Sequence, residues 1–214
     1  MRDSRRQPSA RGNLDRHPDG AALPLDRCKD RAVILLDFSP DKPSGPSGSG
    51  PALHIDIRGD IDAELLARVA SVLDAYPDAA ELHLHVDSPG GDFVPAFDMY
   101  VALSNHRAAH KVANIANASS AALLPVIAMD HRVAAPSARI LLHQVEQCPR
   151  GRWTAAKHAE TADFLSWLDA SMAAGFAIRT GAPAEVFLAA MADEEPASLD
   201  WCLSTNILTE IRNV

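Results

Sequence analysis

From about residue 52 onward, segments with the two-residue period of a β-strand alternate with segments that have the period of an α-helix. Leu53 to Ile57 alternates strictly between apolar and polar residues, and Leu82 to Val86 repeats the pattern. Apolar residues with helical spacing follow each strand, first after Asp62 and then from Phe93 to about Asn105. Strands that alternate with helices favour an α/β fold with a mainly parallel sheet, because parallel neighbours need a crossover connection.

The same alternation continues to the C-terminus and predicts a longer helix in the last third of the chain. The further predicted elements are a strand over 112–116, a buried helix over 120–129, short strands over 133–135 and 139–142, a long amphipathic helix over 154–178, a helix after Pro183, a C-terminal helix and a strand over 207–211.

The composition changes along the chain and predicts three parts. Residues 1–30 are rich in Arg, Asp, Pro and Gly and show neither period, which predicts a disordered arm. Residues 31–51 predict one strand followed by a flexible loop of Pro, Gly and Ser. Residues 52–214 predict one compact domain.

Charge and cysteine content exclude several classes of protein. The 28 acidic residues exceed the 20 lysines and arginines, which argues against a nucleic-acid partner. No apolar run approaches the roughly 18 residues that a membrane span needs, so we expect no membrane partner. The three cysteines are widely spaced and form neither a disulfide framework nor a metal-binding pair, which is typical of a reducing compartment. A cytoplasmic protein is expected.

Two strand-to-helix junctions carry residues suited to acyl-transfer chemistry. Gly90 and Gly91 follow one strand, allow positive φ and leave backbone N–H groups free at a helix start, where negative charge is stabilised. Ser120 has the equivalent position after the next strand and is either a helix N-cap or a nucleophile. His143 stands at the end of a later strand, where it is either a partly buried structural residue or a base.

Taken together, these segments resemble a known family. Ser-Pro-Gly-Gly at 88–91, Ala-Ser-Ser at 118–120, Asp130, Pro136 and Leu-His-Gln at 142–144 resemble the Clp-type proteolytic subunit and its phage prohead-protease-like relatives, at matching intervals. The resemblance implies the ClpP/crotonase-like α/β fold, with a mainly parallel sheet and a long handle-type helix.

The resemblance also implies roles for individual residues. Ser120 matches the nucleophile and His143 the general base, while Gly91 and Ala121 match the residues whose N–H groups form the oxyanion hole. An extended substrate would lie beside Gly90 and Gly91.

Two neighbouring carboxylates are the candidates for the third member of the triad. After a Thr-Gly pair that matches the family, an ungapped count places Glu194 at the family's aspartate, whereas Asp193 is the chemically matched residue one position earlier. Either carboxylate could orient His143 and stabilise its protonated form.

The expected function is that of a serine endopeptidase similar to the proteolytic subunit of ATP-dependent Clp protease. The resemblance implies unfolded or extended peptides as substrates, a homo-oligomeric ring or stacked rings, and no cofactor. An ATP-driven unfoldase of the AAA+ class is a further implied partner, although the N-terminal segment does not resemble the family's docking sequence. The alternatives are a catalytically inactive ring subunit or binding module, and an acyl-CoA enzyme of the crotonase type.

Two further groups of residues are interpreted as structural or interfacial. His83 and His85 face the same side of a strand, a spacing that could bind a metal, but no third ligand with matching spacing is evident and we predict no metal. The predicted long helix carries Phe164 and Trp167, and this much aromatic surface would favour association between copies.

Overall fold

The structure, a computed structural model, describes residues 50–213; the predicted arm and the strand before the Pro/Gly/Ser loop lie outside these residues. The described part contains one six-stranded sheet in which four long strands run parallel, in chain order. These strands are β1 (Ala52–Ile61), β2 (Glu81–Gly91), β3 (His110–Ser119) and β4 (His131–Leu141). Two short strands pair with β4: β5 (Pro196–Ala197) antiparallel and β6 (Glu210–Ile211) parallel. The predicted α/β fold with a mainly parallel sheet is confirmed.

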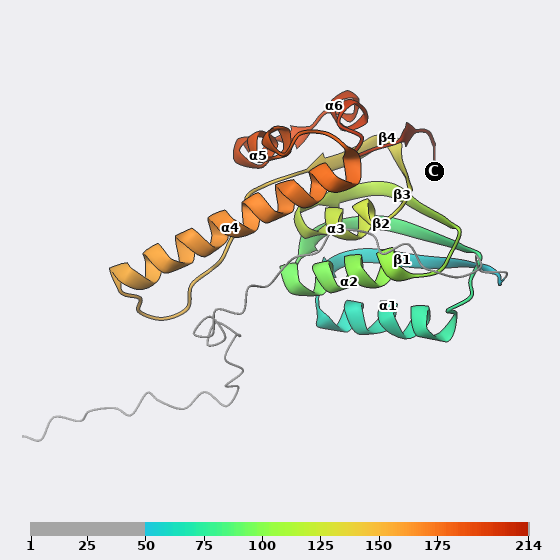
Figure 1. Cartoon of the computed structure of the whole chain (residues 1–214), viewed down its shortest axis with the longest axis horizontal. Coiled ribbons are helices and arrows are strands. Elements are labelled where there is room, and N and C mark those ends of the chain that lie inside the picture. The colour runs from blue at the N-terminus through green and yellow to red at the C-terminus, as the bar shows by residue number, and fades with distance from the viewer. Residues whose placement is uncertain (1–49, 214) are drawn as a thin grey trace, which may run out of the picture. The chain divides into compact units, whose positions relative to one another are not determined.

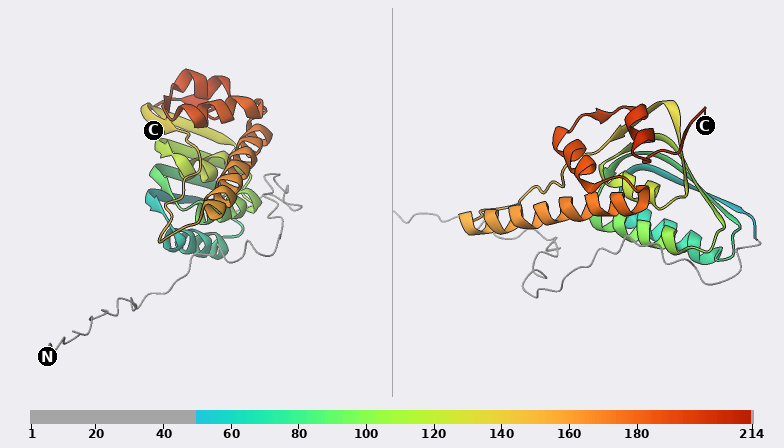
Figure 2. Two further views of the ribbon diagram at one scale, coloured as in Figure 1. Left: turned by 90° about the vertical axis from the view of Figure 1, so that its left-hand side faces the viewer. Right: turned by 45° about the horizontal axis from the view of Figure 1, so that its top comes forward.

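The helices that follow the first three strands cover one face of this sheet (Figure 1). They are α1 (Ala63–Ala75), α2 (Phe93–Asn105), the single 3₁₀ turn η2 (Ser120–Ala122) and α3 (Leu123–Ile127). The long helix α4 (Ala155–Thr180) begins beyond the sheet and returns to it with its C-terminal half (Figure 2). The helices α5 (Ala184–Asp193) and α6 (Leu199–Ser204) lie beside the β4 side of the sheet.

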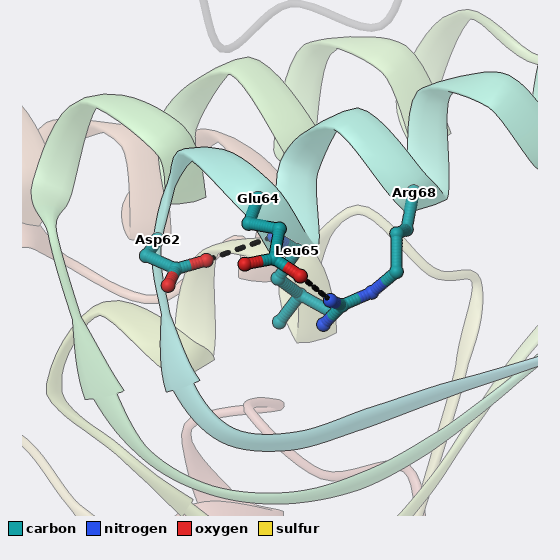
Figure 3. A network of polar contacts seen from close by, with 4 residues as sticks. All are labelled: Asp62, Glu64, Leu65 and Arg68. Atoms are coloured by element: carbon teal, nitrogen blue, oxygen red, sulfur yellow. Dashed lines mark hydrogen bonds and ion pairs between the residues drawn. The ribbon is translucent and has the colours of Figure 1, made fainter.

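Local sequence explains where α1 begins (Figure 3). The Asp62 carboxylate accepts a hydrogen bond of 2.8 Å from the backbone N–H of Leu65, which satisfies a donor that has no partner within the helix. One turn further, Arg68 donates to Glu64 at 2.7 Å, across the i, i+4 spacing that brings side chains together on a helix. The cap is worth about 1 kcal/mol and fixes the turn by which the chain leaves β1.

Three predicted elements differ from the structure. The strand predicted over 207–211 is limited to the two residues of β6. The two short strands predicted over 133–135 and 139–142 are one continuous strand, β4, in which pairing with β3 stops after Ala134 and resumes at Arg139. Pro136 lies in that gap, where its missing N–H costs no ladder hydrogen bond. The helix predicted over 120–129 is divided into η2 and α3, because Ser120 has a positive φ and starts a tight turn.

The C-terminal segment is held against β4 by a buried arginine. Arg132 is 4% exposed and donates hydrogen bonds to the carbonyl groups of Met129, Asn206 and Ile207. Burial lowers the pKa of its guanidinium to about 10, which leaves it charged at neutral pH.

Across the described residues, no helix has the length and apolar character needed to cross a bilayer.

Candidate active site

The C-terminal end of β2 is built for close approach of the neighbouring strand end. Gly90 and Gly91 have φ values of +105° and +144°, which residues with a Cβ rarely adopt. A Cβ on Gly90 would lie 2.7 Å from the carbonyl oxygen of Ser119 and 2.8 Å from Cβ of Ser120. The Ser88 hydroxyl fixes this turn by donating to the carbonyl of Gly59 at 2.6 Å and accepting from the N–H of Gly90 at 3.1 Å. Glycine is therefore required for Ser120 to lie against β2.

Ser120 has a strained backbone at the end of β3. Its φ is +56°, in the left-handed region that costs a residue with a Cβ on the order of 1–2 kcal/mol. Residues held in such conformations cluster at functional sites, where the surrounding structure determines them. Ser119 pairs with Leu141 in the ladder between β3 and β4, so Ser120 and the chain after Leu141 leave the sheet side by side.

The predicted nucleophile, base and oxyanion-hole residues line one cavity. Its volume is about 360 Å³, and its wall includes Ser120, His143, Gly91 and Ala121. Gly90 is buried and is not part of this wall. The remaining lining residues are mainly apolar or sulfur-containing: Phe93, Leu123, Leu142, Val145, Cys148, Met172, Phe176 and Met191, with Asp92, Gln144 and Glu146 as the polar members.

The hydrogen bonds of a working triad are not formed at His143. Its Nδ1 atom is buried and has no hydrogen-bond partner. Among the described residues, no hydrogen bond joins the His143 ring to the hydroxyl of Ser120. A buried ring nitrogen without a partner is costly, so this position would gain from an acceptor or donor brought next to it.

The two carboxylates predicted to complete the triad lie outside the cavity. Asp193 ends α5 and Glu194 caps it with a φ of +57°, and both are exposed. The antiparallel ladder of β5 and β4 nevertheless pairs Pro196 with Leu141. Extending that antiparallel register by two residues would put Glu194 opposite His143, and by three residues would put Asp193 opposite Gln144.

A buried carboxylate that the sequence analysis did not select fixes the chain just after His143. Asp169 on α4 is 6% exposed and accepts a 2.7 Å hydrogen bond from the N–H of Val145 and a 3.3 Å bond from the side-chain amide of Gln144. It lies beside the buried Leu168 of the same helix. The signal in the sequence that could have identified Asp169 was a carboxylate among the apolar residues of the predicted long helix.

The side chains near the cavity do not form a metal site. Within residues 50–213, no group of three or more histidine, cysteine, aspartate or glutamate side chains is arranged to hold a metal ion. Cys148 lies in the cavity wall and is exposed, while Cys202 is buried and both are free thiols.

Comparison with known proteins adds a family and a fold. The family model described as Clp protease matches residues 52–202 of the chain. Among solved structures, a point mutant of ClpP1 from Listeria monocytogenes superposes with a TM-score of 0.64 at 18% sequence identity, covering 75% of this chain and 91% of that one. A search of curated proteins found no match.

Proposed function

This chain belongs to the Clp protease family, and from that premise we propose that it is a serine endopeptidase acting by acyl-enzyme chemistry. The observation that carries the proposal is that Ser120, His143, Gly91 and Ala121 line a single cavity although they come from separate parts of the sequence. A nucleophile, a base and two backbone donors are the groups that acyl transfer requires.

The reaction would proceed in two steps through an ester on Ser120. The hydroxyl oxygen attacks the carbonyl carbon of the peptide bond while His143 accepts its proton. The N–H groups of Gly91 and Ala121 donate hydrogen bonds to the resulting oxyanion, and such donors each contribute on the order of 10²-fold or more in rate. The peptide C–N bond then breaks, the leaving amine takes the proton from His143, and water hydrolyses the ester with the same base.

Glu194 is our proposed third member of the triad. The unpaired Nδ1 of His143 needs an acceptor that holds its proton and leaves Nε2 free to act on Ser120. The register of β5 favours Glu194 over Asp193, because it would put Glu194 opposite His143.

The substrate class follows from the cavity and the strand beside it. Apolar side chains form most of the wall, which favours a peptide with an apolar residue at the cleaved position. An extended peptide would lie beside Gly91, which is exposed and lines the cavity, and be held by main-chain hydrogen bonds, as in other cases of strand addition. The buried Gly90, expected from the sequence to bind substrate as well, would support the site from behind.

We further propose that the active form is a homo-oligomer. Trp167 on α4 is 39% exposed and stacks on Phe164 of the same helix, at a ring-centroid distance of 5.9 Å. Burial of these rings against another copy would remove apolar surface from water. Cytoplasmic localisation stays a prediction from the cysteine content, and partnership with an ATP-driven unfoldase stays a prediction that follows from the resemblance.

A second candidate, a catalytically inactive ring subunit, is favoured by one observation. The hydrogen bonds from His143 to a carboxylate and to Ser120 are not formed, so the described conformation is not ready for catalysis. Apo active sites often have long catalytic contacts that tighten only with substrate, which is why the peptidase is preferred.

Labelling with a fluorophosphonate probe separates the two candidates. We expect the full chain to be modified at Ser120, to cleave an unstructured protein such as casein, and to lose both properties in Ser120→Ala with the same oligomeric state. Ser119→Ala is the matched control, because this neighbouring serine is not in the cavity wall. Absence of labelling and cleavage in a correctly folded wild-type protein would favour the inactive subunit.

A further inference from the structure

Three histidines form one cluster on the face of the sheet opposite α1 and α2. The parallel register of β1 and β2 pairs His54 directly with His83, and His85 follows two residues later on the same face. The ring of His54 stacks on both of the others, with centroid distances of 4.8 Å to His83 and 5.4 Å to His85 and interplanar angles of 16° and 14°. The sequence places only His83 and His85 together; the strand register adds His54.

Two ring nitrogens in this cluster have a spacing close to that of a metal chelate. Nδ1 of His54 and Nε2 of His85 are 3.1 Å apart, so one of them holds a proton that the other accepts. Two imidazole nitrogens on a tetrahedral Zn²⁺ ion, each about 2.05 Å from the metal, are separated by about 3.3 Å. A metal ion could therefore bind between these two nitrogens with small rotations of the two rings, while the proton that they share moves to the other nitrogen of its own ring.

The third ring has its proton position fixed by a carboxylate. Nε2 of His83 lies 2.9 Å from the Glu81 carboxylate, which requires the proton on that nitrogen and leaves the lone pair of the neutral ring on Nδ1. Carboxylates in this position commonly orient histidines that bind metals.

We propose that His54 and His85, with His83 as an additional ligand after rotation, bind one divalent ion of the late transition metals on this face. Imidazole nitrogens favour Zn²⁺, Ni²⁺ and Cu²⁺, and Cu²⁺ binds tightest among these at a given site. The described residues hold no ready group of three ligands, so two imidazoles and water form the initial coordination. His54 is exposed and the other two rings are partly exposed, which gives the ion direct access. This proposal does not depend on the peptidase activity.

Calorimetric titration with zinc chloride tests the proposal on the untagged full chain carrying Cys28→Ser and Cys148→Ser, which removes two thiols that could bind the ion. We expect one saturable site at pH 7.5 that takes up one zinc ion per chain. His54→Ala and His85→Ala should each weaken binding at least about tenfold. His158→Ala, which removes a histidine on α4, should leave it unchanged.

Two results would overturn the inference. One is the absence of saturable binding at zinc concentrations up to about 100 µM. The other is an equal loss of affinity in His158→Ala and His54→Ala, which would indicate scattered coordination by surface histidines. Circular dichroism of each variant shows that it is folded, and the electron paramagnetic resonance spectrum of the Cu²⁺ complex provides an independent measurement, with at least two coupled nitrogens expected.

Discussion

Replacing Gly90 with alanine tests whether close backbone approach positions Ser120. The new Cβ would lie 2.8 Å from Cβ of Ser120, whereas ordinary contact begins near 3.4 Å, so one of the two must move by about 0.6 Å. Relief of such overpacking costs about 1–3 kcal/mol. The φ of +105° adds about 1–2 kcal/mol, because an alanine is strained in that conformation. We expect the free energy of unfolding to fall by about 2–5 kcal/mol.

The same displacement should reduce catalysis, because misplacement of a reacting group by about 1 Å can cost on the order of 10²-fold in rate. The rate of fluorophosphonate labelling at Ser120 measures this loss directly, and urea denaturation measures the loss of stability. We expect labelling to slow by about tenfold or more.

Gly181→Ala is the matched control for Gly90→Ala. Gly181 has a φ of +80° and ends α4, and a Cβ there would meet nothing within 4 Å. It should therefore show only the conformational cost of about 1–2 kcal/mol and keep the wild-type labelling rate. If the two variants lose equal stability and Gly90→Ala is labelled at the wild-type rate, close packing against β2 does not position the serine.

Three further predictions concern buried and catalytic side chains. Asp169→Ala should lower kcat, because it leaves the N–H of Val145 unpaired and frees the loop that carries His143. Asp169→Asn keeps an acceptor and should retain most of the activity. Equal losses of the two variants in a peptide-hydrolysis assay would contradict this positioning role. Glu194→Gln should reduce kcat by on the order of 10³–10⁴-fold and Asp193→Asn by less than about threefold, and the reverse order would assign the triad to Asp193. Burial raises the pKa of Cys202 from 9.0 to about 12, so the native state keeps a proton that the unfolded chain loses. The contribution of this thiol to the free energy of unfolding should therefore fall by about 1.4 kcal/mol per pH unit above pH 9. Urea denaturation at pH 8 and at pH 10.5 measures the loss of stability between the two pH values, which should be smaller in Cys202→Ala than in the wild type.

The sequence predicts the shared cavity because its residues lie at the ends of neighbouring parallel strands. Gly91 ends β2, Ser120 follows β3 and His143 follows β4, and these three strands are adjacent in the sheet. Carboxyl ends of parallel strands meet at one edge, which explains why the residues that the family resemblance selects lie together. The length of β4 was predicted wrongly, because an interior proline is normally read as a strand break and here lies in a gap of the ladder.

Contacts that depend on register or on distant helices could not be predicted in this way. His54 and His83 are neighbours only because of the parallel register of β1 and β2, which a helix and two turns separate in sequence. The shorter of the two hydrogen bonds to Asp169 comes from a backbone N–H, which every residue type except proline carries, so nothing at that position of the sequence marks the pair.

The conformation of His143 depends on contacts made on both sides of it along the chain. On its N-terminal side, Leu141 pairs with Pro196 of β5, and on its C-terminal side, Val145 is held by Asp169 of α4. The serine, in contrast, is positioned by its own turn and by Gly90. Leu141 also pairs with Ser119 of β3, so the base and the nucleophile share one support, but only the chain that carries His143 is held by α4 as well. A change in the packing of α4 would therefore displace the base more than the nucleophile.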